Sequence, residues 1–124
     1  MNIKNILVVD DSKTETMIVT KILIDAGFLV KTASDAEHAL LQLKEDKPDL
    51  ILMDVVMPGK SGFQLTRILS RDDALGTIPI ILCSSKSQET DRLWGLKQGA
   101  REYITKPVNA ARLIAAIQRI EAHQ

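Results

Sequence analysis

Runs of apolar residues alternate with segments of helical periodicity along the whole chain. The apolar runs predict five strands, at residues 6–9, 29–33, 50–53, 79–83 and 103–104. Apolar residues spaced three and four apart predict a helix after each strand, beginning near Ser12, Ser34, Ser61, Gln88 and Asn109. Strands that alternate with helices in this way are typical of βαβ units and a parallel sheet.

Capping signals mark the starts of the first two helices. Ser12 with Glu15, and Ser34 with Glu37, fit the capping-box pattern. In that pattern the serine hydroxyl and the glutamate carboxylate each accept a hydrogen bond from the other residue's backbone N–H. Glu15 is therefore interpreted as a capping residue.

The apolar stripes predict which side chains of the helices face the sheet. The stripe of the first helix contains Ile18, Val19, Ile22, Leu23 and Ala26. In the fourth helix, Leu93 and Leu96 are expected to face inward. Trp94 lies off this stripe and is expected to pack in a groove between helices, with a place on a partner surface as the alternative.

The character of the strands predicts their order. The first, third and fourth are nearly continuous apolar runs, as expected for strands covered on both faces. The second and fifth are short or mixed, which suits the edges of a sheet. This fits an α/β fold of the flavodoxin-like (βα)5 type with strand order 2-1-3-4-5, in which ligands bind beyond the carboxyl ends of the first and third strands.

Three carboxylates are predicted to meet at that point. Asp10 and Asp11 follow the first strand, and Asp54 ends the third. Adjacent anions repel one another unless a cation neutralises them. Oxygen ligands with room for water suit Mg²⁺, so the sequence predicts a magnesium site.

A hydroxyl and an ammonium are predicted to reach the same rim. Ser84 ends the fourth strand, and Lys106 follows the fifth. Such groups beside a carboxylate–metal cluster can hold the oxygens of a transferring phosphoryl group, a reaction that depends mostly on positioning and charge neutralisation. Asp54 is the candidate nucleophile, which would form an acyl phosphate.

These motifs together resemble the receiver domains of two-component response regulators, and in particular their single-domain chemotaxis-type members. The resemblance covers residues 1–124 as one domain, on the motifs Asp10-Asp11, Met53-Asp54, Met57-Pro58-Gly59, Ser84 and Lys106-Pro107. Residues 85–100 are also similar to the regulators of type IV pilus twitching motility, the PilH and PilG type.

The resemblance implies a role for each residue of the site. Asp54 would accept a phosphoryl group from a histidine kinase or phosphotransfer domain. Asp11, Asp54 and the backbone carbonyl of Val56 would bind Mg²⁺, with Asp10 assisting through water. Ser84 and Lys106 would contact the phosphoryl group.

The resemblance also implies a way for the signal to leave the site. Tyr103 matches an aromatic switch position that changes rotamer as the Ser84 hydroxyl moves, and plain packing of Tyr103 at the edge of the sheet is an equal alternative. The Lys106–Pro107 bond would be cis.

Val56 and Lys86 occupy positions that tune autodephosphorylation in this family. The Val56 side chain cannot orient an attacking water, so a fairly long-lived phosphoryl group is expected.

Composition argues against nucleic-acid binding, membrane binding and disulfide bonding. Among 124 residues, Lys+Arg and Asp+Glu number 16 each, so the net charge of +0 argues against nucleic acid and polybasic membrane binding. Cys83 is the only cysteine, which excludes an internal disulfide. No apolar run approaches the ~20 residues of a membrane helix. We expect a cytoplasmic protein that contacts a downstream target protein, and either a monomer or a weak dimer formed on phosphorylation.

Three alternatives remain open at this point. An aspartate-nucleophile phosphatase usually has a second acidic residue two positions after the nucleophile, where this chain has Val56. A pseudo-receiver that only binds proteins would not need the complete set of charged residues. A flavodoxin would have its flavin phosphate repelled by the acidic strand ends. The leading interpretation is a signalling protein that catalyses only its own phosphorylation and dephosphorylation.

Overall fold

Five parallel strands form a single sheet in the computed structural model, which describes residues 2–123. The strand order is β2-β1-β3-β4-β5, as the apolar runs predicted. The strands are β1 (Asn5–Val9), β2 (Leu29–Ala33), β3 (Leu50–Asp54), β4 (Ile80–Ser84) and β5 (Glu102–Thr105). The two mixed strands are at the edges, and the three apolar strands are in the centre.

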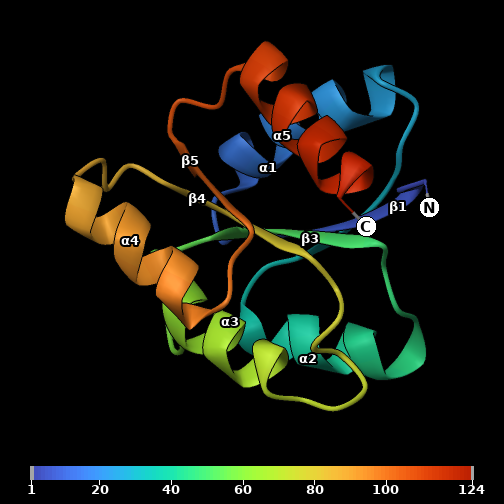
Figure 1. Cartoon of the computed structure of the whole chain (residues 1–124). Helices are drawn as coiled ribbons and strands as arrows, with labels where there is room; N and C mark the ends of the chain where they lie inside the picture. The colour runs from blue at the N-terminus through green and yellow to red at the C-terminus, as the bar shows by residue number, and fades with distance from the viewer. Residues whose placement is uncertain (1, 124) are drawn as a thin grey trace.

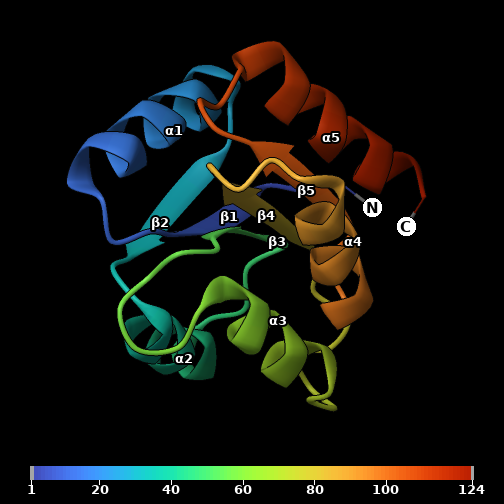
Figure 2. The same ribbon diagram turned by 90° about the vertical axis from the view of Figure 1, so that its left-hand side faces the viewer.

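Helices cover both faces of the sheet (Figure 1). One face carries α1 (Lys13–Asp25) and α5 (Ala110–Ala122). The other carries α2 (Ala36–Glu45) and α3 (Gly62–Ser70), with α4 (Glu89–Gln98) beside α3 and β5 (Figure 2). Within residues 2–123, no helix has the length and apolar character needed to cross a membrane.

Each face of the sheet has its own hydrophobic core. Successive strand residues point to opposite faces, so both sets of side chains of a central strand become buried. In β3, for example, Ile51 and Met53 pack toward α2 and α3, while Leu50 and Leu52 pack toward α1 and α5. This arrangement explains the continuous apolar runs of the central strands.

The capping-box predictions at the first two helices are wrong in part. Ser12 is the N-cap of α1, and its Oγ accepts a hydrogen bond from the backbone N–H of Glu15. However, the N–H of Ser12 donates to Asp10 Oδ1 at 2.9 Å rather than to the Glu15 carboxylate. At α2 the N-cap is Asp35 and not Ser34, because Asp35 Oδ1 accepts a hydrogen bond from the backbone N–H of His38 at 2.9 Å.

The predicted inward face of the fourth helix is wrong. Leu93 and Trp94 are 52% and 48% exposed, and Leu96 is only half-buried. Gly95 faces inward instead, so close to the sheet that an added Cβ would lie 3.0 Å from a Leu82 methyl carbon. The close approach of the helix backbone at this glycine, and not an apolar stripe, sets the orientation of α4.

The stripe of the first helix is narrower than predicted. Val19 and Leu23 are buried, Ile22 is half-buried, and Ile18 and Ala26 are exposed. The periodicity of α1 is blurred because apolar residues also occur on its outer side, as at Met17.

Asp49 connects the start of β1 to the loop before β3. Its Oδ2 accepts hydrogen bonds from the backbone N–H groups of Lys4 and Asn5, each at 2.9 Å. The Asn5 N–H in particular lowers the pKa of the Asp49 carboxyl from its ordinary value. A carboxylate with a lowered pKa stabilises the fold above its unfolded-state pKa, and this stabilisation is lost as pH falls through the folded-state pKa.

We predict that Asp49→Ala lowers the free energy of unfolding by about 1 kcal/mol at pH 7, through the loss of these hydrogen bonds. The difference from the unmodified protein should shrink at pH 3, below the unfolded-state pKa of about 3.9. Urea unfolding at both pH values measures it. Asp46→Ala, which removes only an exposed ion pair with Lys31, is the control. An equal loss at both pH values would contradict the assignment.

Candidate functional site

The register of the central strands places the charged residues at one edge of the sheet. Val9 of β1 pairs with Met53 of β3, so Asp10 and Asp54 follow at the same level. Asp54 pairs in turn with Cys83 of β4, and Ser84 comes next along that strand. The ends of these three strands therefore converge as the sequence predicted, at the edge where parallel sheets bind ligands.

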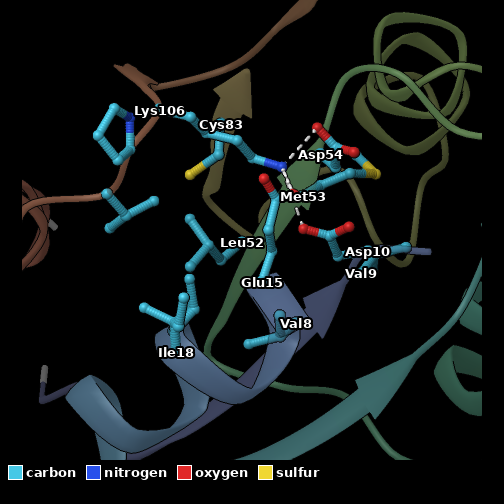
Figure 3. Close-up of a pocket in the computed structure, with 13 residues that line it drawn as sticks. Val8, Val9, Asp10, Glu15, Ile18, Leu52, Met53, Asp54, Cys83 and Lys106 are labelled. Atoms are coloured by element: carbon cyan, nitrogen blue, oxygen red, sulfur yellow. Dashed lines mark hydrogen bonds and ion pairs between the residues drawn. The ribbon is translucent and has the colours of Figure 1, made fainter. Parts of the chain in front are cut away.

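Lys106 lies at the centre of this group (Figure 3). Its Nζ is 3.2 Å from Asp10 Oδ2 and 3.2 Å from Asp54 Oδ1. A third carboxylate, that of Glu15 in the first turn of α1, also contacts the ammonium. The backbone holds Lys106 in place as well, since its N–H donates to the Ser84 carbonyl at 2.8 Å. The Lys106–Pro107 peptide bond is cis, as the family resemblance implied.

Burial and charge shift the pKa values of the two central groups. Burial raises the pKa of the Asp54 carboxyl above its ordinary value, although the Lys106 ammonium acts in the opposite direction. For Lys106, burial lowers the pKa, but the contacts with Glu15, Asp10 and Asp54 outweigh burial and raise it. Lys106 is therefore a fixed positive charge at neutral pH.

The arrangement of carboxylates fits a divalent cation. Within the described residues, Asp10, Glu15 and Asp54 form a cluster whose carboxylate oxygens lie within 4.8 Å of one another. Three carboxylates against one ammonium leave surplus negative charge, and oxygen-only donors suit Mg²⁺. Asp11, a predicted metal ligand, is exposed and does not belong to this cluster, and Val56 is 55% exposed in the loop after β3.

Ser84 and Tyr103 meet at the backbone of Lys86. Ser84 is 1% exposed, and its Oγ accepts a hydrogen bond from the Lys86 N–H at 3.0 Å. The Tyr103 hydroxyl donates to the Lys86 carbonyl at 2.8 Å. One peptide segment thus connects the strand-end hydroxyl with the half-buried tyrosine.

A small apolar cavity of about 110 Å³ lies between the sheet and α1, beneath Lys106. Lys106 and Glu15 line it together with Ile18, Leu52 and Cys83 (Figure 3). Burial raises the pKa of the Cys83 thiol to about 12. Cys83 is therefore a protonated, inert thiol, which agrees with its interpretation as a core residue.

Two residues of the site, Glu15 and Gly62, were not predicted from the sequence. Glu15 was assigned only a capping role, although its place in the first helical turn after the aspartate pair was a usable signal. Gly62 begins α3, and an added Cβ there would lie 2.2 Å from the backbone oxygen of Asp54. A glycine at the start of a helix, shortly after the candidate nucleophile, was the signal for this close approach.

Comparison with known proteins agrees with this geometry. The family model described as the response regulator receiver domain matches residues 6–118. The chain belongs to the response regulator receiver domain family. This receiver domain is 44% identical over 117 residues to the protein PilH of Pseudomonas aeruginosa, covering 94% of this chain and 97% of PilH.

Other relatives extend the comparison. The receiver domain is 38% identical over 117 residues to the phosphate regulon transcriptional regulatory protein PhoB of Escherichia coli, covering 94% of this chain and 51% of PhoB. The crystal structure of CheY4 from Vibrio cholerae matches with a TM-score of 0.88 and 30% identity, covering 95% of this chain and 98% of CheY4. A solved structure from Chloroflexus aurantiacus matches with a TM-score of 0.92 and 28% identity, covering 98% and 99% of the two chains. The flavodoxin-like fold and the resemblance to receiver domains are confirmed.

We predict that Gly62→Ala lowers the free energy of unfolding by about 3 kcal/mol. The added methyl group would collide with backbone atoms of Asp54 and Val55, which cannot rotate away. This outweighs the gain of about 1 kcal/mol that alanine normally brings to a helix. Urea unfolding tests it, with Arg67→Ala on the exposed side of α3 as the control. If Gly62→Ala is as stable as the unmodified protein, the close contact does not exist in solution.

Proposed function

We propose that this receiver domain accepts a phosphoryl group on Asp54 from the phosphohistidine of a histidine kinase or phosphotransfer domain, and then signals through protein contacts. The contact of Lys106 Nζ with both Asp54 and Asp10, at 3.2 Å each, supports this role most directly. It gives the candidate nucleophile a fixed cation at the place where phosphoryl charge would arrive.

The transfer reaction requires Asp54 in its ionised form. A lone pair of one Asp54 oxygen forms a bond to phosphorus, and the phosphorus–nitrogen bond of the donor breaks. The electron pair of that bond stays on the histidine nitrogen, so no external oxidant or cofactor electron is needed. Lys106 favours the ionised form of Asp54 and offers an N–H group to a phosphoryl oxygen, while the buried Ser84 hydroxyl offers a second contact.

The oxygen-rich edge is proposed to hold Mg²⁺ through Asp11, Asp54 and the carbonyl of Val56, with Asp10 assisting through water. When bound, the ion neutralises charge on the phosphoryl oxygens. The surplus of carboxylates over ammonium groups at this edge supports a cation there.

The output is proposed to pass through Ser84, Lys86 and Tyr103. If the Ser84 hydroxyl turns toward a phosphoryl oxygen, the Lys86 N–H loses its partner and Tyr103 can change position. Helix α4 follows Lys86 in the chain. Its exposed Leu93 and Trp94 offer apolar surface to a target protein.

The signalling pathway is proposed from the similarity of this chain to PilH. PilH is similar to this chain over nearly the full length of both, which agrees with the resemblance of residues 85–100 to twitching-motility regulators. We therefore place this receiver domain in pilus-linked or chemotaxis-like motility control. A phosphatase acting on small esters is disfavoured, because position 56 holds an exposed valine instead of an acid.

We predict that acetyl phosphate labels the protein in the presence of Mg²⁺ and that Asp54→Asn is not labelled. Removal of Mg²⁺ with EDTA should reduce labelling of the unmodified protein by roughly a hundredfold or more, since charge neutralisation is most of the catalysis. Separation of phosphorylated from unphosphorylated protein on a phosphate-affinity gel measures both effects. Equal labelling of the two proteins would refute Asp54 as the acceptor.

We also predict a long-lived phosphoryl group, because the Val56 side chain cannot orient an attacking water. Val56→Asn should shorten its half-life by roughly tenfold, since an amide can position that water. The decay of labelled protein after removal of the donor measures this. Rapid decay of the unmodified protein that only a substitution of Lys86 abolishes would contradict the assignment to Val56.

A further inference from the structure

The Lys106 ammonium has three carboxylate neighbours, two of which accept its hydrogen bonds. Asp10 and Asp54 each contact Nζ at 3.2 Å, and Glu15 is the third partner. A lysine ammonium has three donors and no acceptor. A phosphoryl group on Asp54 takes over the contact of that carboxylate, and any further phosphoryl oxygen competes with Glu15 and Asp10 for the other donors of Lys106.

Glu15 is available for Lys106 because Asp10 has taken over its capping role. A glutamate three residues after a serine N-cap normally reaches back to the N-cap N–H. Here that N–H, from Ser12, donates to Asp10 Oδ1 at 2.9 Å. The Glu15 carboxylate instead extends across the cavity edge to Lys106 (Figure 3).

We infer that Glu15 is a positioning residue, which holds Lys106 toward α1 in the unphosphorylated protein and is displaced by the incoming phosphoryl group. This inference rests on the proposed function of Asp54 and deepens it. Glu15 does not touch the reacting atoms, and it acts through the position of the Lys106 ammonium.

Exposure decides which of the three carboxylates leaves. The side chain of Glu15 is 42% exposed, whereas those of Asp10 and Asp54 are 7% and 9% exposed. A carboxylate released into water regains its hydration, while a buried one left without a cation suffers the full cost of desolvation. Asp54 is converted rather than released, because phosphorylation turns its carboxylate into the neutral acyl group of an acyl phosphate and moves the charge to the phosphoryl oxygens.

The competition makes the unphosphorylated state more stable than it would be without Glu15. A phosphoryl group that takes a second donor of Lys106 must replace the charge-assisted hydrogen bond between Glu15 and Lys106. It must also approach the negative charge of the Glu15 carboxylate. Removal of that charge should therefore favour the phosphorylated state and leave Lys106 in place to contact it.

The test uses beryllofluoride, a non-covalent mimic of the phosphoryl group on aspartate, with Mg²⁺ and the full chain. Fluorine NMR of the bound mimic gives its affinity, and calorimetry gives the affinity for Mg²⁺ alone. Glu15→Gln should bind beryllofluoride roughly tenfold more tightly, because a competing charge-assisted contact is lost. Its Mg²⁺ affinity should change by no more than about threefold, since the contact removed is with lysine.

Two controls separate a contact with Lys106 from a general effect of charge. Glu37→Gln removes the same charge from the first turn of α2, where the side chain is exposed, and should leave the affinity for beryllofluoride unchanged. In a Lys106→Met background, Glu15→Gln should lose most of its effect, because the pair no longer exists. Nitrogen-15 NMR of the Lys106 ammonium should show a shifted signal in Glu15→Gln before any mimic is added. Glu15→Ala, checked by circular dichroism, replaces Glu15→Gln if the latter folds poorly.

Each other outcome overturns the inference in a distinguishable way. A large loss of Mg²⁺ affinity without tighter beryllofluoride binding would make Glu15 a metal ligand. Unchanged affinities would make the Glu15 contact irrelevant, and an equal gain with Glu37→Gln or in the Lys106→Met background would indicate charge alone. If the unmodified protein binds no beryllofluoride, the proposed function of Asp54 fails, and this inference fails with it.

Discussion

The parallel pairing of β3 with β1 on one side and β4 on the other is the constraint on which the rest of the site depends. Each strand advances along the sheet by the same rise per residue, so a fixed register keeps the strand ends level. Asp10 and Asp54 are neighbours only because Val9 pairs with Met53. A register shift of one residue would also turn every buried side chain of the strand to the other face, so the two cores hold the charged edge in place.

The second constraint is that buried charges must be paired. A carboxylate such as Asp54 is costly to bury alone, and the Lys106 ammonium offsets part of that cost. The positive charge of Lys106 does not balance the negative charge at this edge, since three carboxylates surround one ammonium. This edge therefore carries net negative charge, which a cation would neutralise. Phosphoryl transfer depends on such charge neutralisation.

Sequence patterns predicted the sheet better than the helix faces, and for a physical reason. Central strands are buried on both sides, so their apolar runs carry a strong signal, and the order of all five strands followed from it. Helix α4 follows no such rule, because Gly95 brings its backbone against the sheet and leaves Leu93 exposed. The contact of Glu15 with Lys106 was not predicted either, because the local capping rule already accounted for Glu15, whereas the Ser12 N–H in fact donates to Asp10. Interactions set by tertiary proximity leave little trace in local periodicity.

Asp10 holds the scaffold together as well as contributing charge to the site. Its N–H donates to the carbonyl of Ala33 at 3.0 Å, and its two carboxylate oxygens accept from Ser12 and Lys106. It thus joins the end of β2, the start of α1 and the charged edge. Genetic dissection should therefore differ sharply between the two adjacent aspartates. Substitutions of Asp10 should combine damage to the scaffold with damage to the charged edge, whereas substitutions of the exposed Asp11 should leave the scaffold contacts of Asp10 intact.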